Sequence, residues 1–262
     1  MAFFPFIKPQ KPNILKEMGF VNDQDGIIER YAREKNGWDI HLNHSKQTIL
    51  NAITIHKPKS IAILGSGWLL DIPIDELSKI GETIYLYDIV HPAQIKHKIS
   101  KYSNIEIIES DITGGSIQNT WEEIERWKKQ GGIINLNSIP GIGFVPQKKT
   151  DMIISLNILN QLDILICDYI INKTTIQNED LVDLRKSIQQ KHIESLQKQA
   201  FCLISDITEI TKNKITNVIS ERPLAVIDLP KTNYSEQWLW DFDLSGNYYD
   251  EQEVTFNVIA LY

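Results

Sequence analysis

Four short runs of apolar and β-branched residues alternate with helical segments, and this order restricts the chain to very few folds. The runs are SIAIL (60–64), TIYLYDI (83–89), NIEIIES (104–110) and TDMIISL (150–156). Such alternation is typical of a parallel sheet with right-handed crossover connections. After helical segments at 157–171 and 178–199, a fifth run, AFCLISDI, occupies 200–207. The sequence therefore predicts an α/β fold with a doubly wound, mostly parallel sheet.

Both ends of the chain depart from this alternation. Residues 26–55 have apolar residues at broadly helical spacing, interrupted at Asn36 and Gly37, which predicts two N-terminal helices. The C-terminal part has three strand-like runs without helices between them, PLAVIDL (223–229), EQWLWDF (236–242) and EVTFNVIALY (253–262). A turn-rich segment separates the last two, so we expect a C-terminal antiparallel hairpin at one edge of the sheet.

The charge balance argues against nucleic acid as the main partner. Lys and Arg total 27 against 34 Asp and Glu, the net charge is −7, and no dense basic run occurs. The N-terminal MAFFPFIKPQKP is too short to span a bilayer, and Cys167 and Cys202 stand in apolar runs where free thiols pack as small hydrophobic groups. We therefore expect a cytoplasmic protein with no membrane partner.

A glycine turn follows the first predicted strand. Gly65 and Gly67 flank Ser66, and glycine there allows a tight turn and a close approach of a ligand to the main chain. About twenty residues later the second strand ends in Asp88, where an acid can accept hydrogen bonds from both hydroxyls of a ribose. The alternative is an ordinary turn from strand to helix.

The third predicted strand also ends in an acid. Asp111 and Ile112 follow it, and the carboxyl ends of parallel strands meet at one edge, where open α/β folds bind ligands. An acid for the sugar, a polar group for an adenine amine and an aliphatic side chain against the ring together suit a nucleoside. The alternative for Asp111 is a cap on the following helix.

With these motifs, residues 58–262 resemble the class I S-adenosylmethionine-dependent methyltransferases. That family has five alternating units and a terminal hairpin in a Rossmann-like, seven-stranded sheet whose last strand is antiparallel. The resemblance implies S-adenosylmethionine as cofactor. The site residues that it implies are Gly65, Ser66 and Gly67 for the methionine part, Asp88 and Ile89 for the ribose and adenine, Asp111 and Ile112 for the adenine, and Leu156 and Asn157 near the sulfonium. Residues 1–57 are then a helical extension that covers the site.

The glycine turn at residues 65–67 and its flanks depart from the family's usual motif in two places. Family members usually have an acid two residues before the first glycine, which holds the amino group of the cofactor, and this chain has Ile63 there. The usual third glycine is replaced by Leu69. Asp71 is the nearest carboxylate, and it either caps the helix that follows or binds the cofactor's ammonium group.

The candidate residues for positioning an acceptor are Asn157, Gln161 and His41. An amide can orient a hydroxyl, amine or carboxylate without carrying charge, although a helix cap is the alternative for the amides. His41 lies in the N-terminal helices, which in this fold class often form one wall of the substrate pocket. We expect His192 to be exposed and His91 to shape the adenine rim, and no histidine pair has metal-ligand spacing, which predicts no metal.

The leading hypothesis is a methyltransferase of EC class 2.1.1 that acts on a small-molecule acceptor by direct in-line transfer. One alternative is a non-catalytic binding or assembly module, because the first motif has lost an acid and a glycine. A nicotinamide-dependent oxidoreductase fits the glycine turn and Asp88, but the missing third glycine disfavours it. Trp238 and Trp240 share one sheet face, which predicts either burial or a contact in a homodimer.

Overall fold

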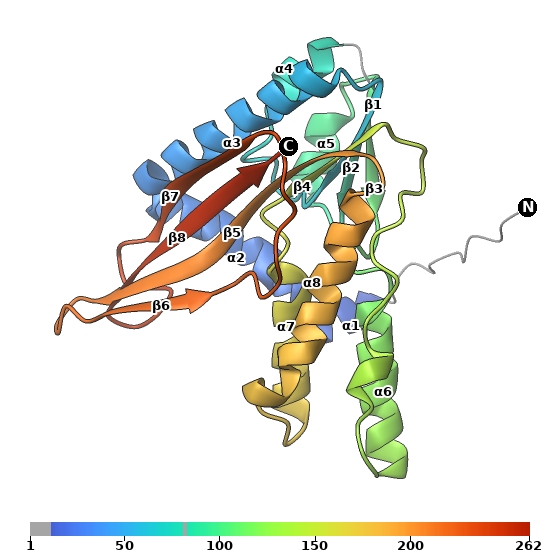
Figure 1. The fold of residues 1–262 in the computed structure, drawn as a ribbon, viewed down its shortest axis with the longest axis vertical. Coiled ribbons are helices and arrows are strands. Elements are labelled where there is room, and N and C mark those ends of the chain that lie inside the picture. The colour runs from blue at the N-terminus through green and yellow to red at the C-terminus, as the bar shows by residue number, and fades with distance from the viewer. Residues whose placement is uncertain (1–11, 81–82) are drawn as a thin grey trace, which may run out of the picture.

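A computed structural model gives the fold and describes residues 12–80 and 83–262 (Figure 1). Its strands are β1 (Ser60–Leu64), β2 (Thr83–Asp88), β3 (Ile105–Glu109), β4 (Met152–Leu156), β5 (Ala200–Asn213), β6 (Ile219–Pro223), β7 (Ser235–Asp243) and β8 (Gln252–Leu261). Their order is β3-β2-β1-β4-β5-β8-β7, with β6 paired to β5. Strands β1 to β5 are parallel, whereas β8 is antiparallel to both neighbours. The predicted α/β fold, with its C-terminal antiparallel hairpin, is confirmed.

The sheet has one strand more than the predicted seven. The additional strand, β6, lies just before the run 223–229 that was expected to form a strand. Strand β6 pairs with the far half of β5, while the run 223–229 forms no strand beyond Pro223. The side chain of Gln189 explains this, because its Oε1 accepts the N–H of Val226 at 2.9 Å and its Nε2 donates to the carbonyl of Leu224 at 3.0 Å. A helix side chain thus binds the backbone groups that a strand partner would have bound.

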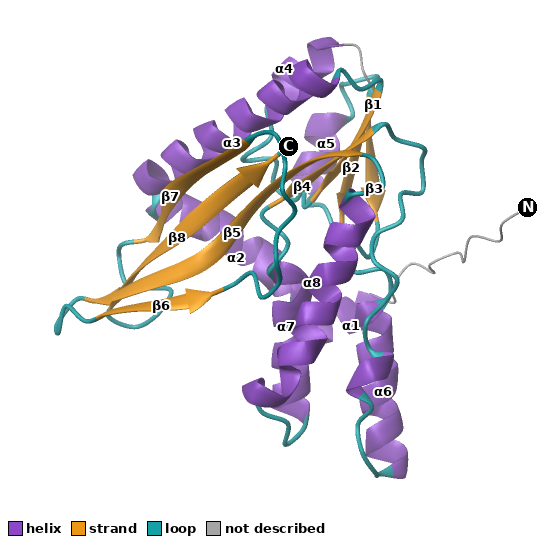
Figure 2. Ribbon diagram, viewed as in Figure 1, coloured by secondary structure: helices purple, strands orange, loops and turns teal. Residues whose placement is uncertain are grey.

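Helices cover both faces of the sheet (Figure 2). They are α1 (Pro12–Glu17), α2 (Phe20–Arg33), α3 (Lys35–His56), α4 (Ile74–Ile80), α5 (Ala93–Ile99), α6 (Ser116–Gln130), α7 (Gln161–Lys173) and α8 (Val182–Leu196), with short 3-10 turns at Leu136–Ser138 and Asn178–Leu181. None of the helices in the described residues is long and apolar enough to cross a membrane.

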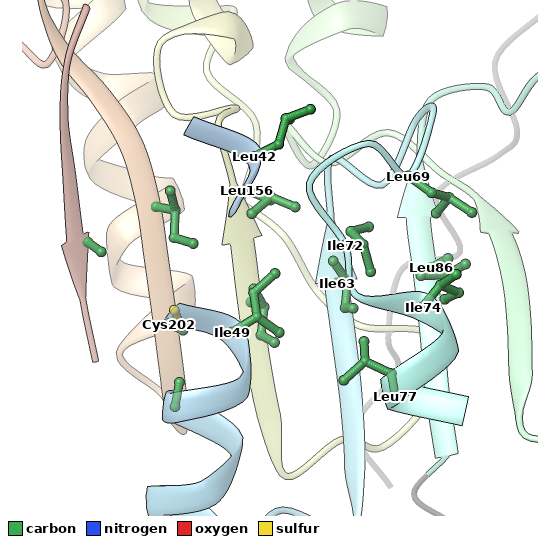
Figure 3. Close-up of a cluster of buried hydrophobic side chains, with 14 of the residues drawn as sticks. Leu42, Ile49, Ile63, Leu69, Ile72, Ile74, Leu77, Leu86, Leu156 and Cys202 are labelled. Atoms are coloured by element: carbon green, nitrogen blue, oxygen red, sulfur yellow. The ribbon is translucent and has the colours of Figure 1, made fainter. Parts of the chain in front are cut away.

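The sheet divides the buried apolar side chains into two cores. On β1, Ile61 and Ile63 belong to the first core, beneath α3, α4 and α5, part of which is drawn in Figure 3. Ala62 and Leu64 belong to the second core, beneath α6, α7 and α8. Successive side chains of a strand point to opposite faces, so a continuous apolar run supplies both cores at once. This arrangement leaves the carboxyl ends of the strands as the place for a ligand.

The N-terminal helices cross that edge of the sheet. Ile14 of α1 packs in the second core, while Ile27 and Tyr31 of α2 pack against the first. The predicted break at Asn36 and Gly37 is wrong, because α2 ends at Arg33 and both residues lie in the first turn of α3. Gly37 serves close packing instead, since a Cβ there would lie 2.5 Å from the carbonyl oxygen of Asp241 on β7.

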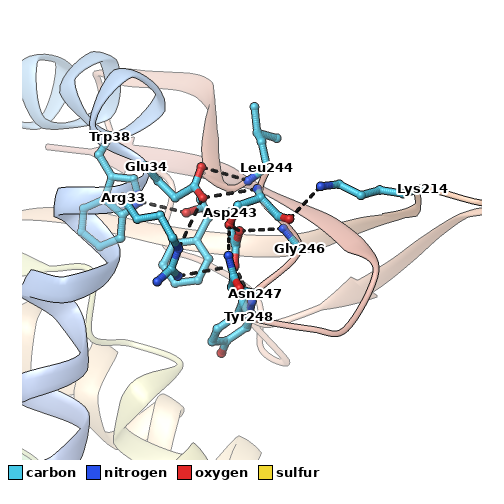
Figure 4. A network of polar contacts seen from close by, with 11 residues as sticks. Arg33, Glu34, Trp38, Lys214, Asp243, Leu244, Gly246, Asn247 and Tyr248 are labelled. Atoms are coloured by element: carbon cyan, nitrogen blue, oxygen red, sulfur yellow. Dashed lines mark hydrogen bonds and ion pairs between the residues drawn. The ribbon is translucent and has the colours of Figure 1, made fainter.

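A polar network fastens the junction of α2 and α3 to the β7–β8 turn (Figure 4). The Glu34 carboxylate accepts the N–H groups of Leu244 and Ser245 at 3.2 and 3.3 Å. Arg33 lies 3.8 Å from the buried carboxylate of Asp243. The helices that cross the strand ends are therefore anchored at the far edge of the sheet.

The apolar loop 131–150 packs on the second core, where Ile139 and Phe144 are buried. The regular structure of this loop is limited to the 3-10 turn Leu136–Ser138. Lys191 of α8 instead donates to the carbonyl oxygen of Gly141 at 2.5 Å, which fixes the loop through a side chain.

Candidate functional site

A cavity of about 260 Å³ lies at the carboxyl ends of the central strands. All twelve predicted site residues line it. They are His41, Gly65, Ser66, Gly67, Asp71, Asp88, Ile89, Asp111, Ile112, Leu156, Asn157 and Gln161. Helix α2 contributes further lining residues, among them Gln24, Ile27 and Arg30, so the N-terminal segment forms part of the cavity wall.

The turn after β1 has the backbone conformation of a glycine-rich turn. Gly65 has φ +83, and a Cβ there would lie 2.6 Å from the carbonyl oxygen of Leu156, so only glycine fits. Leu69, which stands where a third glycine is usual, has φ +57 and is 4% exposed. The left-handed conformation is thus kept at a leucine whose side chain is buried in the core, although it is unfavourable for that residue.

The Asp88 carboxylate binds this turn. Its Oδ2 accepts the N–H of Gly67 at 2.7 Å, and its Oδ1 accepts the N–H of Ile89 at 2.7 Å. The Nε2 of Gln24, from α2, also donates to Oδ1 at 3.2 Å. Burial raises the pKa of Asp88 to about 6, although these hydrogen bonds favour the ionised form.

Asp111 braces the loop between β3 and α6 while it lines the cavity. Its carboxylate accepts the N–H groups of Thr113 at 2.8 Å and Gly115 at 3.1 Å. The capping alternative therefore applies in part, because the bonds go to the turn before α6, and the N-cap position is Gly115. Ile112 is buried beside it at the cavity wall.

Asp71 contacts the end of β4. Asp71 stands three residues before α4 begins, and its Oδ2 accepts a hydrogen bond from the Nδ2 of Asn157 at 2.9 Å. Burial is the main cause that raises the pKa of Asp71 to about 6. Asn157 itself has φ +51, in the left-handed region. This carboxylate is therefore part of the cavity wall.

His41 is completely buried behind Asn157. Its Nε2 lies 3.1 Å from the Nδ2 of Asn157, and its ring stacks on Trp240 at a centroid separation of 3.9 Å. Burial lowers the pKa of His41 to about 3, so the ring is neutral at physiological pH. Gln161, which is exposed, donates to the carbonyl oxygen of Asn157 at 2.8 Å. His41 thus contacts the side chain of Asn157, and Gln161 binds its backbone.

Two other histidines differ from expectation. His192 was expected at the surface, but it is 1% exposed, because this face of α8 packs on the second core, and its Nε2 lies 2.8 Å from Ser155 Oγ. His91 is buried and lies 2.8 Å from Ser66 Oγ, so it supports the glycine turn. Within residues 12–80 and 83–262, no three His, Cys, Asp or Glu side chains gather as metal ligands would.

Several residues that line the cavity were not predicted from the sequence. Asp206 stands at the end of the fifth predicted strand, so the rule that identified Asp88 and Asp111 also applied to it. Gln24 and Arg30 of α2 and Trp240 of β7 reach the cavity only through tertiary packing, and no sequence motif marks them. Trp238 and Trp240 are buried against α3, in agreement with the burial alternative.

Neither a family model nor a curated protein matches the sequence. Among solved structures, a DhpI complex with SAH aligns at TM-score 0.34 and 6% identity, over 96% of this chain and 98% of that one. A Burkholderia thailandensis 1,6-didemethyltoxoflavin-N1-methyltransferase with S-adenosylhomocysteine aligns at TM-score 0.38 and 9% identity, over 100% and 94%. The methyltransferase domain of a bacterial CtHen1 aligns at TM-score 0.35 and 10% identity, over 84% and 98%. The strand order itself, and not these matches, establishes the fold.

Proposed function

We propose that this chain, which has the fold of the class I S-adenosylmethionine-dependent methyltransferases, binds S-adenosylmethionine and transfers its methyl group directly, in line, to a small-molecule acceptor. One observation carries the proposal. The residues predicted from separate strand ends line a single cavity in the order of the sheet, from Asp111 after β3 and Asp88 on β2, through the glycine turn after β1, to Asn157 after β4. Open α/β sheets bind their ligands at this edge.

The adenosine would lie at the β2–β3 side of the cavity. Asp88 would accept hydrogen bonds from the ribose hydroxyls, with the backbone N–H groups of Gly67 and Ile89 already orienting its carboxylate. Ile89 and Ile112 offer apolar contact for the adenine ring, and Asp111 offers an acceptor for its amine. Gln24 would have to share or release the Asp88 carboxylate.

The methionine end would lie over the glycine turn. Asp71 lines the cavity with a carboxylate whose side chain binds Asn157, and it would hold the ammonium group that the family's missing upstream acid usually holds. Bringing a cation close to a buried carboxylate favours its ionised form, so binding would lower the raised pKa of Asp71. Leu69 keeps the left-handed backbone conformation that a glycine would adopt at this position of the turn.

When it is bound, the cofactor supplies a methyl group on a sulfonium that an aligned nucleophile can attack. The role of the chain is then alignment. Leu156 and Asn157 would contact the region of the sulfonium, and Gln161 and His41 would hold Asn157 in place. His41 is too weak a base to take a proton near neutrality, so it acts as a positioning residue.

The alternatives have less support. Dinucleotide-binding sheets of the all-parallel type have no antiparallel strand between β5 and the next strand, whereas β8 occupies that position here. A non-catalytic module would not need an intact turn or an acid near the methionine end, and the cavity has both.

Calorimetric titration of the purified chain tests the proposal. S-adenosylhomocysteine and S-adenosylmethionine should bind with a one-to-one ratio, and NAD should bind more weakly. Transfer of a labelled methyl group to a small acceptor, sought in a panel of amines, alcohols and acids, separates an enzyme from a binding module. If neither sulfur ligand binds at millimolar concentration, the proposal is wrong.

A further inference from the structure

The cavity continues beyond Asn157 to the far side of β4. The N–H of Asn157 donates to the carbonyl oxygen of Ile204 on β5 at 2.8 Å, and Asp206 follows two residues later on that strand. In the sheet order β1-β4-β5, Asp206 therefore lies on the opposite side of Asn157 from the glycine turn. A ligand that filled the β1–β3 part would leave the part beside Asp206 for a second molecule.

Asp206 has an unused acceptor atom. Its side chain is 4% exposed and lines the cavity, and its Oδ2 accepts a hydrogen bond from Asn160 Nδ2 at 2.7 Å. Its Oδ1 has no hydrogen-bond partner within residues 12–80 and 83–262, and the same is true of Asn160 Oδ1. Buried acceptors are rarely left unpaired, because the loss of their hydration is costly. These two oxygens indicate that a donor from a ligand belongs here.

Neither arginine of the cavity wall pairs with Asp206 among residues 12–80 and 83–262, although Nε of Arg30 has no hydrogen-bond partner there. Arg222 binds both oxygens of Glu209, at 3.1 and 3.0 Å. The guanidinium of Arg30 lies over the rings of Phe242 and Tyr248, each at 4.8 Å. In the described part of the chain Asp206 therefore has no cationic partner of its own, and burial, together with the neighbouring charge of Glu209, raises its pKa to about 6.

The wall as a whole is acidic. Its acids are Asp23, Asp71, Asp88, Asp111, Asp206 and Glu209, whereas its basic side chains are Arg30 and Arg222, with His41 neutral. A cleft lined mainly by one sign of charge attracts ligands of the opposite sign. The rest of this end is apolar and aromatic, with Leu224, Trp240 and Phe256 facing the same space.

We propose that Asp206 and Asn160 bind the N–H groups of an amine with an apolar or aromatic body, and that this amine nitrogen is the methyl acceptor. This inference rests on the proposed methyl transfer. An amine that enters as an ammonium ion first loses one proton to water. The nitrogen lone pair then forms the N–C bond, the S–C bond breaks with its electron pair remaining on sulfur, and the product keeps both nitrogen protons as a methylammonium ion that pairs with Asp206.

The surroundings of Asp206 disfavour other acceptors. A carboxylate would be repelled by Asp206 and Glu209 in a medium that screens charge poorly. An alcohol could donate one hydrogen bond, but the charge attraction that an ammonium ion gains would be absent. Asp206 is ionised near neutrality despite its raised pKa, so it can attract the ammonium form of the amine and stabilise the methylammonium product.

Three matched probes test this with the protein saturated in S-adenosylhomocysteine. They are 2-phenylethylamine, 2-phenylethanol and 3-phenylpropionate, which share a phenyl ring and differ in the polar group. By titration at pH 7.5, the amine should bind at least about tenfold more tightly than the alcohol, as a charge-assisted hydrogen bond implies, and the acid should not bind. Asp206→Asn should abolish this preference and leave the affinity for S-adenosylhomocysteine within about twofold.

The matched control is Asp228→Asn, the same change at an exposed loop position, which should keep the amine preference. Retained binding of S-adenosylhomocysteine by Asp206→Asn shows that this variant is folded. Equal binding of amine and alcohol by the unaltered protein, no binding of the amine, or a preference that survives in Asp206→Asn overturns the inference. Failure of S-adenosylhomocysteine to bind the unaltered protein instead overturns the proposed function.

Discussion

The indole N–H of Trp238 donates to Nδ1 of His41 at 3.1 Å, and this bond fixes the tautomer of the neutral His41 ring. Because indole is only a donor, Nδ1 of the neutral ring must be the acceptor, and Nε2 must carry the proton. The amide of Asn157 then meets a donor at His41 and a carboxyl at Asp71. While Asp71 is ionised, Nδ2 of Asn157 donates to its Oδ2 at 2.9 Å and therefore faces the Nε2–H of His41 as donor against donor. An Asn157 amide turned to present Oδ1 to both groups requires a protonated Asp71, which its pKa of about 6 allows in mild acid.

Replacing the indole donor should release the tautomer of His41. In Trp238→Phe, Nδ1 loses its donor, and a buried unpaired acceptor costs roughly 1 to 3 kcal/mol of folding free energy. Nitrogen-15 spectra of the imidazole should show the neutral tautomer with the proton on Nε2 in the unaltered protein. The variant should show a mixture of the two neutral tautomers. The control is Trp127→Phe on α6, which should leave the His41 signals unchanged. A proton on Nδ1 in the unaltered protein would contradict the assignment.

Removing the charge of Asp88 should weaken cofactor binding specifically. Asp88→Asn preserves size but loses a charged acceptor, so the affinity for S-adenosylhomocysteine should fall about 10- to 100-fold by titration. Asp151→Asn is the matched control, because Asp151 accepts the N–H of Lys59 at the amino end of the sheet. An unchanged affinity in Asp88→Asn would remove Asp88 from the proposed ribose site.

Gly65→Ala and Gly132→Ala separate conformational strain from steric overlap. Both glycines have positive φ, +83 and +87, but only at Gly65 would a Cβ meet the backbone, 2.6 Å from the Leu156 oxygen. The left-handed conformation should cost each variant roughly 1 to 2 kcal/mol. The overlap should make Gly65→Ala clearly less stable in urea unfolding. Equal losses would show that the turn moves aside.

Stability should depend on pH through His192. Burial lowers the folded-state pKa of His192 to about 4, below the ordinary value of 6.5, so the unfolded chain binds the extra proton between these values. His192 therefore contributes stability that is complete above pH 6.5 and is lost as the pH falls toward 4, about 3 kcal/mol in all. In His192→Gln this contribution is absent, so the stability difference from the unaltered protein should shrink with acidification. A difference that stays constant from pH 7.5 to 4 would refute the lowered pKa.

The parallel part of the fold was predictable because each central strand is buried on both faces. The run 60–64 coincides with β1, since Ile61 to Leu64 must all be apolar to fill two cores. Strand β6 was not predictable, because every residue of ISERP is exposed and nothing in its pattern alternates. It forms because the long strand β5 offers a free edge.

The site could be predicted where residues follow strand ends, because topology alone brings those positions together. Asp88, Asp111 and Asn157 are of this kind, and Asp206 follows the same rule. Gln24 was beyond such reasoning, since its contact with Asp88 depends on how α2 crosses the sheet. The burial of His192 depended likewise on which face of α8 packs inward.

Leu69 shows that a sequence motif and the backbone conformation that the motif usually encodes can be conserved separately. The third position of the turn keeps φ +57 although its residue is leucine, because the core holds the side chain firmly enough to offset the strain. Screening unassigned chains by the torsion angles of this turn, with a buried aliphatic residue accepted at that position, would therefore retrieve relatives that glycine counting discards.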